Sequence, residues 1–139
     1  MRVVADTNTV VSAFLWVGPP KAVLDAARDG GISLHTTPAL LVELKDVLSR
    51  DKFTARTRQV GSTVAGMLTE YRALVAVELP APISPTARDP DDDQVLATAL
   101  GAQARLIVTR EHELLTLGTF DNILILPAAH ALERITAAS

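Results

Sequence analysis

Acidic residues of this chain fall at places where carboxylates could share one site. Asp6 ends an apolar segment at the start of the chain, and Glu111 follows a second apolar segment, residues 106–109. Glu43 lies within an amphipathic helical pattern, and residues 91–93, all aspartate, open another. Open α/β sheets bind ligands beyond the carboxyl ends of their strands. Because clustered carboxylates repel one another unless protons or a cation compensate, and hard cations prefer oxygen ligands, the pattern predicts a Mg²⁺ or Mn²⁺ site.

Each acidic position has a purely structural alternative. Asp6 can cap a following helix, and acidic residues at 91–93 or at Glu111 can complement a helix dipole in a first turn. Glu43 lies beside Val47 at the border of an apolar stripe, where a carboxylate is costly unless it is paired, binds a metal or reaches water. Residues that only cap helices would not be expected to cluster at one end of one sheet. The joint occurrence of these acidic residues therefore favours a shared site.

Composition limits the class of protein. The 139 residues are 48% hydrophobic, which suffices for one compact domain over residues 1–139. The net charge of −3 argues against strong non-specific nucleic-acid binding, although a local basic patch could still serve. Cysteine is absent, which excludes disulfides and thiolate metal sites. The sequence shows neither a run of 18 apolar residues nor a signal-peptide pattern, so we expect no membrane span and a cytoplasmic location.

Predicted strands and helices alternate along the chain. Short apolar runs predict buried strands at residues 3–5, 32–35, 106–109 and 123–126. Apolar periodicity and capping residues predict helices at 8–16, 21–29, 37–48, 60–75, 91–100, 111–117 and 127–135. Fully apolar strands that alternate with helices are typical of a parallel sheet covered on both faces. The predicted fold is a three-layer α/β/α sandwich with a central parallel sheet.

In order along the chain, these motifs resemble PIN-domain ribonucleases. The residues that carry the resemblance are Asp-Thr-Asn at 6–8, Glu43 in the third helix, Arg-Asp-Pro-Asp-Asp-Asp at 88–93, and Val-Thr-x-acidic at 108–111. It covers essentially the whole chain and is closest to the toxins of bacterial and archaeal toxin–antitoxin pairs. It implies metal-dependent hydrolysis of RNA phosphodiesters with Mg²⁺ or Mn²⁺, an antitoxin protein as partner, and a homodimer.

The resemblance also assigns roles to individual residues. It implies a catalytic quartet of Asp6, Glu43, Asp93 and Glu111. The metal ligands it implies are Asp6, Asp92, Asp93 and Glu111. Asn8 and Thr109 match the polar positions that support such sites.

One position departs from the family pattern. The family usually has Gly-Asp where this chain has Arg110-Glu111. The extra methylene of Glu111 moves its carboxylate outward, and Arg110 brings a cation beside the site. This departure favours an alternative function, in which a catalytically weakened domain binds RNA or a protein partner without cleavage.

Two other features allow more than one interpretation. Basic residues between Lys45 and Arg58 are either contacts for RNA phosphates or a solvated face. Residues 14–16, Phe-Leu-Trp, favour core or dimer packing over a base-stacking platform, although Trp16 could be partly exposed. Together with the apolar stripe at 60–75 they predict a homodimer. A phosphotransfer domain is a rival enzyme class, but such sites generally need a lysine after a later strand, and none follows Lys52.

Overall fold

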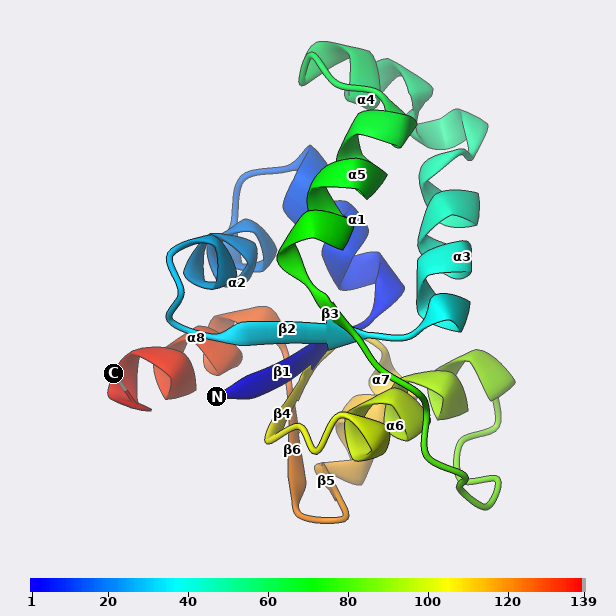
Figure 1. Cartoon of the computed structure of the whole chain (residues 1–139), viewed down its shortest axis with the longest axis vertical. Coiled ribbons are helices and arrows are strands. Elements are labelled where there is room, and N and C mark those ends of the chain that lie inside the picture. Colours follow the sequence, from blue (N-terminus) through cyan, green and yellow to red (C-terminus); the bar gives the residue numbers. More distant parts are fainter. Residues whose placement is uncertain (139) are drawn as a thin grey trace.

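The computed structural model describes residues 1–138, so the predicted domain, 1–139, extends one residue beyond them. Its sheet has the order β3-β2-β1-β4-β6-β5, and all pairs are parallel except β5 with β6 (Figure 1). The strands are β1 (Arg2–Ala5), β2 (Ser33–Thr36), β3 (Ala76–Val77), β4 (Leu106–Val108), β5 (Thr119–Phe120) and β6 (Ile123–Leu126). The helices are α1 (Thr7–Leu15), α2 (Pro19–Arg28), α3 (Pro38–Leu48), the 3₁₀ turn η1 (Asp51–Phe53), α4 (Thr54–Gln59), α5 (Val64–Leu74), α6 (Pro90–Gly101), α7 (His112–Leu117) and α8 (Ala128–Ala138).

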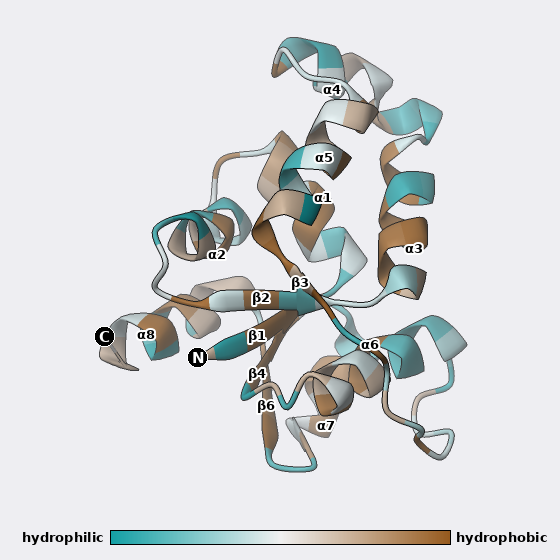
Figure 2. Cartoon of the chain, viewed as in Figure 1, coloured by the Kyte–Doolittle hydropathy of each residue, from teal (hydrophilic) through white to brown (hydrophobic). Residues whose placement is uncertain are grey.

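Alternating side chains of the central strands build two hydrophobic layers. Val3 and Ala5 of β1 belong to one cluster, which α1, α2, α3, α5 and α8 cover. Val4, between them in sequence, belongs to a second cluster on the opposite face with α6 and α7. This is the two-residue period of a strand buried on both faces. The structure therefore confirms the predicted three-layer α/β/α sandwich. In Figure 2 hydrophobic residues, shown in brown, lie along β1 and β6.

Local sequence sets the starts of the helices that follow the strands. Asp6 caps α1 by accepting a hydrogen bond from the Thr9 amide at 3.0 Å. Thr37 caps α3, and Pro38 occupies the first helical position, as the sequence predicts. Asp89 caps α6 in the same way, ahead of Pro90. These caps fix where each helix leaves the sheet.

The predicted helix over residues 60–75 is shorter in the structure. It begins at Val64, because Gly61 has a left-handed backbone (φ +71°) and the Thr63 hydroxyl caps the Gly66 amide at 3.0 Å. Residues 51–59 instead form η1 and α4, which the sequence did not predict, and the two-residue strands β3 and β5 were also missed. Among residues 1–138 no single helix is long and apolar enough to cross a membrane, although α1 and α2, bent by 89°, pass that test as a pair.

The connection from β3 to α6 is held against α6. The Ala81 amide donates to the Ala97 carbonyl at 3.0 Å, where α6 passes beneath the connection. Gly101 permits this approach, since a Cβ there would lie 2.2 Å from the Leu79 carbonyl oxygen. The connection therefore packs against α6 at residues 79–81, and it ends at the acidic start of α6.

Candidate active site

The sheet order places an opening at the carboxyl ends of β1 and β4. From β1 the chain moves to β2 and β3 on one side, and then returns to add β4 on the other side of β1. Helices therefore diverge at this point, which is where open α/β sheets hold ligands. Asp6 directly follows β1, and its amide donates to the Val108 carbonyl at 3.1 Å. Residues 109–111 directly follow β4, so the two predicted acidic positions Asp6 and Glu111 meet at this edge.

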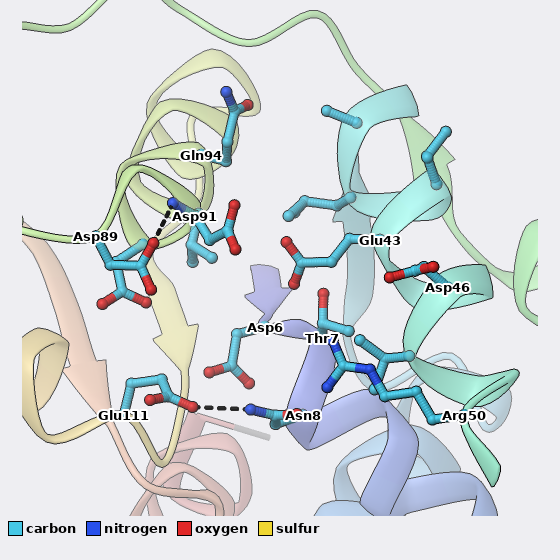
Figure 3. A pocket seen from close by; sticks show the side chains of 16 residues that line it. Asp6, Thr7, Asn8, Glu43, Asp46, Arg50, Asp89, Asp91, Gln94 and Glu111 are labelled. Carbon is cyan, nitrogen blue, oxygen red and sulfur yellow. Dashed lines mark hydrogen bonds between the residues drawn. The ribbon is translucent and has the colours of Figure 1, made fainter.

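An open cavity of about 630 Å³ lies at this edge, between α1, α3 and the start of α6 (Figure 3). We call it the acidic cavity because seven of the side chains that line it are carboxylates, whereas the one basic residue among them is Arg50. The acidic lining residues are Asp6, Glu43, Asp46, Asp89, Asp91, Asp92 and Glu111. So many like charges around one space favour a cationic ligand.

Asp6 is the most rigidly held carboxylate of the cavity. It is only 4% exposed, and it accepts hydrogen bonds from the Thr9 amide at 3.0 Å and from the Thr109 hydroxyl at 2.5 Å. Burial raises the pKa of Asp6, although the hydrogen bonds from Thr109 and Thr9 partly offset this. Glu111 raises that pKa further. Thr109, predicted as a supporting polar residue, therefore orients Asp6 rather than facing the cavity itself.

Glu43 faces Asp6 across the cavity from α3. It is half-buried, and this burial raises its pKa, as do the carboxylates of Asp91, Asp6 and Asp89 in decreasing order. The Thr7 hydroxyl, which Figure 3 shows between Asp6 and Glu43, lies near enough to oppose this rise in the pKa of Glu43, although it is not in hydrogen-bond geometry with that carboxylate.

The Thr7 hydroxyl is itself unusual. Its oxygen is buried, yet it has no protein partner in hydrogen-bond geometry, and it is the one such side-chain atom within residues 1–138. Thr7 is 6% exposed. A buried hydroxyl without a partner costs about 1–3 kcal/mol of stability. Its position at the cavity wall makes it a polar group that a ligand can satisfy.

The structure separates two predicted metal ligands, Asp92 and Asp93. Asp92 lines the acidic cavity, and its pKa is raised to about 6 by burial and by its acidic neighbours Asp89, Glu111, Glu113 and Asp6, in decreasing order. Asp93 instead accepts hydrogen bonds from the amides of Thr86 and Ala87, the latter at 2.7 Å. Successive helical side chains are rotated by about 100°, so neighbouring aspartates cannot share one direction. The structure thus does not bring Asp93 to the cavity.

Glu111 and Asn8 are joined across the edge of the site. The Asn8 side-chain amide donates to Oε1 of Glu111 at 2.9 Å, and both residues line the cavity. The neighbouring Arg110 is directed elsewhere, since its guanidinium lies 3.4 Å from the Ser12 hydroxyl and it does not line the cavity. The expectation that Arg110 brings a cation beside the site is therefore wrong, and the cation that lines the cavity is Arg50, from the end of α3.

Sequence reasoning missed several lining residues. Asp89 and Asp91 flank Pro90 and looked like ordinary helix-start residues, which Asp89 also is. Thr7 lies inside the Asp-Thr-Asn motif, which could have indicated it. Arg50 belongs to the basic segment between Lys45 and Arg58, and the sequence does not indicate which way those side chains point. These residues face the cavity only because α3 and α6 converge on the end of β1.

The cavity offers the donor chemistry of a hard divalent cation. Its charged donors are carboxylate oxygens, and the unpartnered Thr7 hydroxyl adds another oxygen. Within residues 1–138, however, no three His, Cys, Asp or Glu side chains are grouped closely enough to hold one ion. The donor set therefore fits Mg²⁺ or Mn²⁺ in kind, and side-chain rotations are needed for several carboxylates to reach the same ion.

Comparison with known proteins identifies the family. No curated protein matches this chain. PIN domains are generally nucleases, and they generally use divalent metal ions. A family model described as the PIN domain matches residues 2–113, most of the chain and all of the elements that surround the acidic cavity, and the chain therefore belongs to the PIN-domain family.

Proposed function

We propose that this protein is a metal-dependent endoribonuclease that hydrolyses RNA phosphodiesters with Mg²⁺ or Mn²⁺. The observation that carries the proposal is the acidic cavity at the carboxyl ends of β1 and β4, where seven carboxylates face one arginine. Its place in the sheet and its oxygen donors suit a site that holds a cation against a phosphate backbone. Membership of a family of nucleases supports the same conclusion.

The proposed ligand assignment follows the geometry. Asp6 and Asp92 would hold the ion directly, because both line the cavity and one of them is already fixed by hydrogen bonds. Glu43 and Glu111 would act through water or hold a second ion. Asp92 takes the role that the family resemblance implied for Asp93, whose carboxylate accepts hydrogen bonds from backbone amides.

The protein groups have separate tasks in this mechanism. The chemistry that a bound divalent ion supplies is the acidification of a water molecule and the neutralisation of charge on the phosphoryl oxygens. Thr109 and the Thr9 amide keep Asp6 oriented and favour its ionised form, and the Asn8 side-chain amide orients Glu111. The reaction forms a P–O bond to water as a P–O bond of the RNA chain breaks, so no side-chain nucleophile is required.

The proposed biological role is that of a toxin in a toxin–antitoxin pair, acting in the cytoplasm. The resemblance to such toxins supports this role, and the acidic cavity would accept a basic side chain from an antitoxin protein. A homodimer is proposed on the resemblance alone. The apolar stripe that suggested it is largely covered within one chain, since Met67, Leu68 and Tyr71 are buried and Tyr71 packs edge-on against Phe14.

The alternative is a domain that binds RNA or a protein partner without cutting. Two observations favour it: the Arg110-Glu111 sequence, and the lack among residues 1–138 of three carboxylates grouped around one point. The two functions share the fold and differ only in whether the carboxylates converge on an ion when substrate binds.

Cleavage of a single-stranded RNA with Mg²⁺ or Mn²⁺ tests the proposal. Asp6→Asn should reduce the rate by about 100-fold or more, because even indirect contacts to a metal ligand contribute 10–100-fold. Asparagine keeps the α1 cap, so the fold should survive. Glu133→Gln is the matched control, since it also neutralises a carboxylate but on the exposed face of α8. RNA binding by the wild type without any cleavage would favour the binding-only alternative.

A further inference from the structure

Trp16 is exposed at the end of α1 but held in one orientation. It is 45% exposed, and its ring packs edge-on against Phe53, with ring centres 6.1 Å apart. The guanidinium carbon of Arg56 lies 5.7 Å from the centre of the Trp16 ring. Arg56 is fixed in turn, because its Nε donates to the Leu15 carbonyl at 2.6 Å. Contacts with Phe53 and Arg56 thus support a large aromatic side chain that is exposed to solvent.

The surroundings of this ring are basic. Residues 50–60 contain four basic residues and one acidic residue, in a chain whose net charge is −3. Lys52 lies with its Nζ 5.0 Å from the centre of the Phe53 ring. We use the name Trp16 surface for Trp16, Lys52, Phe53 and Arg56. It combines an exposed aromatic ring with cations, which is the combination that binds single-stranded nucleic acid through base stacking and phosphate contacts.

Arg50 connects the Trp16 surface to the acidic cavity. It lines the cavity from the end of α3, and the next residue, Asp51, begins η1, which carries Lys52 and Phe53. Within the described chain the Arg50 side chain makes no hydrogen bond or ion pair, although carboxylates line the same cavity. Figure 3 shows it extended along the α1 side of the cavity. An unpaired arginine beside a site for phosphodiester chemistry is suited to a phosphate of the substrate.

We propose that single-stranded RNA leaves the acidic cavity over Arg50 and lies on the Trp16 surface, with one base stacked on Trp16. This inference rests on the proposed function for the identity of the nucleic acid. Arg50 and Lys52 contact backbone phosphates. Arg56 supports the Trp16 ring through the contact between its guanidinium and that ring. The substrate class is single-stranded RNA because a paired base has no free face to offer the indole ring.

Charge distinguishes this occupant from a second copy of the chain. Interface cores between proteins are depleted in lysine, whereas Phe53, which packs against Trp16, has the Nζ of Lys52 5.0 Å from its ring centre. Two copies paired through this surface would also bring like charges together. A polyanion with unstacked bases satisfies both the ring and its cations.

Intrinsic fluorescence tests the proposal directly, since Trp16 is the only tryptophan of the chain. The full chain is titrated in EDTA, which prevents cleavage, with a single-stranded RNA decamer and with the same decamer in a duplex. We expect a saturable fluorescence change with the single strand and a much weaker one with the duplex. No saturable change with the single strand up to about 100 µM, the weak end of non-specific binding, would overturn the proposal.

Variants separate stacking from phosphate contacts. Trp16→Leu keeps an apolar contact to Phe53, and with Mg²⁺ or Mn²⁺ it should raise KM about tenfold at unchanged kcat, as expected for one lost stacked base. Lys52→Ala should lower the salt slope of log K by about 0.7, measured with labelled RNA in EDTA. Arg105→Ala, at the opposite end of β4, removes one positive charge as the matched control and should change neither quantity.

The outcomes distinguish this proposal from the nuclease itself. Cleavage by Trp16→Leu with wild-type KM overturns the Trp16 surface and leaves the nuclease intact. Saturable quenching in EDTA without cleavage in Mg²⁺ or Mn²⁺ supports the surface and removes the nuclease. A fluorescence change on simple concentration of the protein, accompanied by a rise in mass by light scattering, assigns Trp16 to a self-association interface and overturns the proposal.

Discussion

The carboxylates of Asp92 and Asp93, adjacent in sequence, lie on different sides of α6. Asp92 enters the acidic cavity, whereas Asp93 holds the connection from β3 through the Thr86 and Ala87 amides. One aspartate thus belongs to the site and the other to its scaffold. A pair of isosteric variants can therefore separate metal binding from structural support at neighbouring positions.

We predict that Mg²⁺ or Mn²⁺ raises the melting temperature of the wild type, because a ligand that binds only the folded state stabilises it. Asp92→Asn should lose most of this rise. Asp93→Asn should melt lower in EDTA, since a hydrogen bond to a charged group contributes about 1.5–3 kcal/mol, but it should keep the metal-induced rise. Thermal melts with and without metal measure both effects. Loss of the rise only in Asp93→Asn would make Asp93 the ligand instead.

The metal-free protein should lose stability as the pH rises towards 7. The pKa of Asp92 is about 6 in the folded protein against an ordinary 3.8, chiefly because of burial. Between these values the folded state holds a proton that the unfolded chain does not, so this stabilisation is complete below 3.8 and is lost as the pH rises through about 6. In EDTA, Asp92→Asn should flatten the decline in melting temperature over this range. An equally steep decline in the variant would contradict the assignment.

Thr7→Val should separate stability from metal binding. Valine keeps the shape of threonine and removes a buried hydroxyl that has no protein partner, so the metal-free variant should be as stable as the wild type or more stable by about 1 kcal/mol. The metal-induced rise in melting temperature should shrink, because a cavity oxygen is lost. Thr7→Ser is the matched control and should retain the rise. A strong destabilisation of Thr7→Val in EDTA would show that the hydroxyl has a protein partner.

Glu111 tests whether the departure from the family pattern is tolerated. Glu111→Gln should reduce RNA hydrolysis strongly and leave the fold intact, since the side chain is only half-buried. Asn8→Ala should reduce it by about 10–100-fold, because Asn8 orients Glu111 through the 2.9 Å hydrogen bond. Glu111→Asp should keep or increase activity, since it restores the acid that the family normally has. Cleavage by Glu111→Gln at the wild-type rate would remove Glu111 from the site. Cleavage by Glu111→Asp alone, with an inactive wild type, would identify a disabled nuclease.

Much of the fold could be predicted from sequence because it depends on local patterns. Residues 3–5 and 106–108 are apolar at every position, so they had to be strands buried on both faces. Thr37-Pro38 fixed the start of α3 through capping, which involves only neighbouring residues. The stretch 51–63 was harder, because its short helices carry little periodicity and a glycine with positive φ ends the apolar pattern.

The sequence by itself determined which residue types are available for chemistry: carboxylates after two strands, one in α3 and a group before α6, with no cysteine. It also determined the family, since those motifs occur in order along the chain. Only the tertiary structure decided which members of an acidic group share a cavity. A run of three aspartates spans most of a helical turn, so their directions differ by about 100° each, and the packing of α6 against the sheet selects the direction that faces Asp6. For the same reason Arg50, Thr7 and Trp16 acquire their surroundings from helices that converge in space, and no local pattern encodes that convergence.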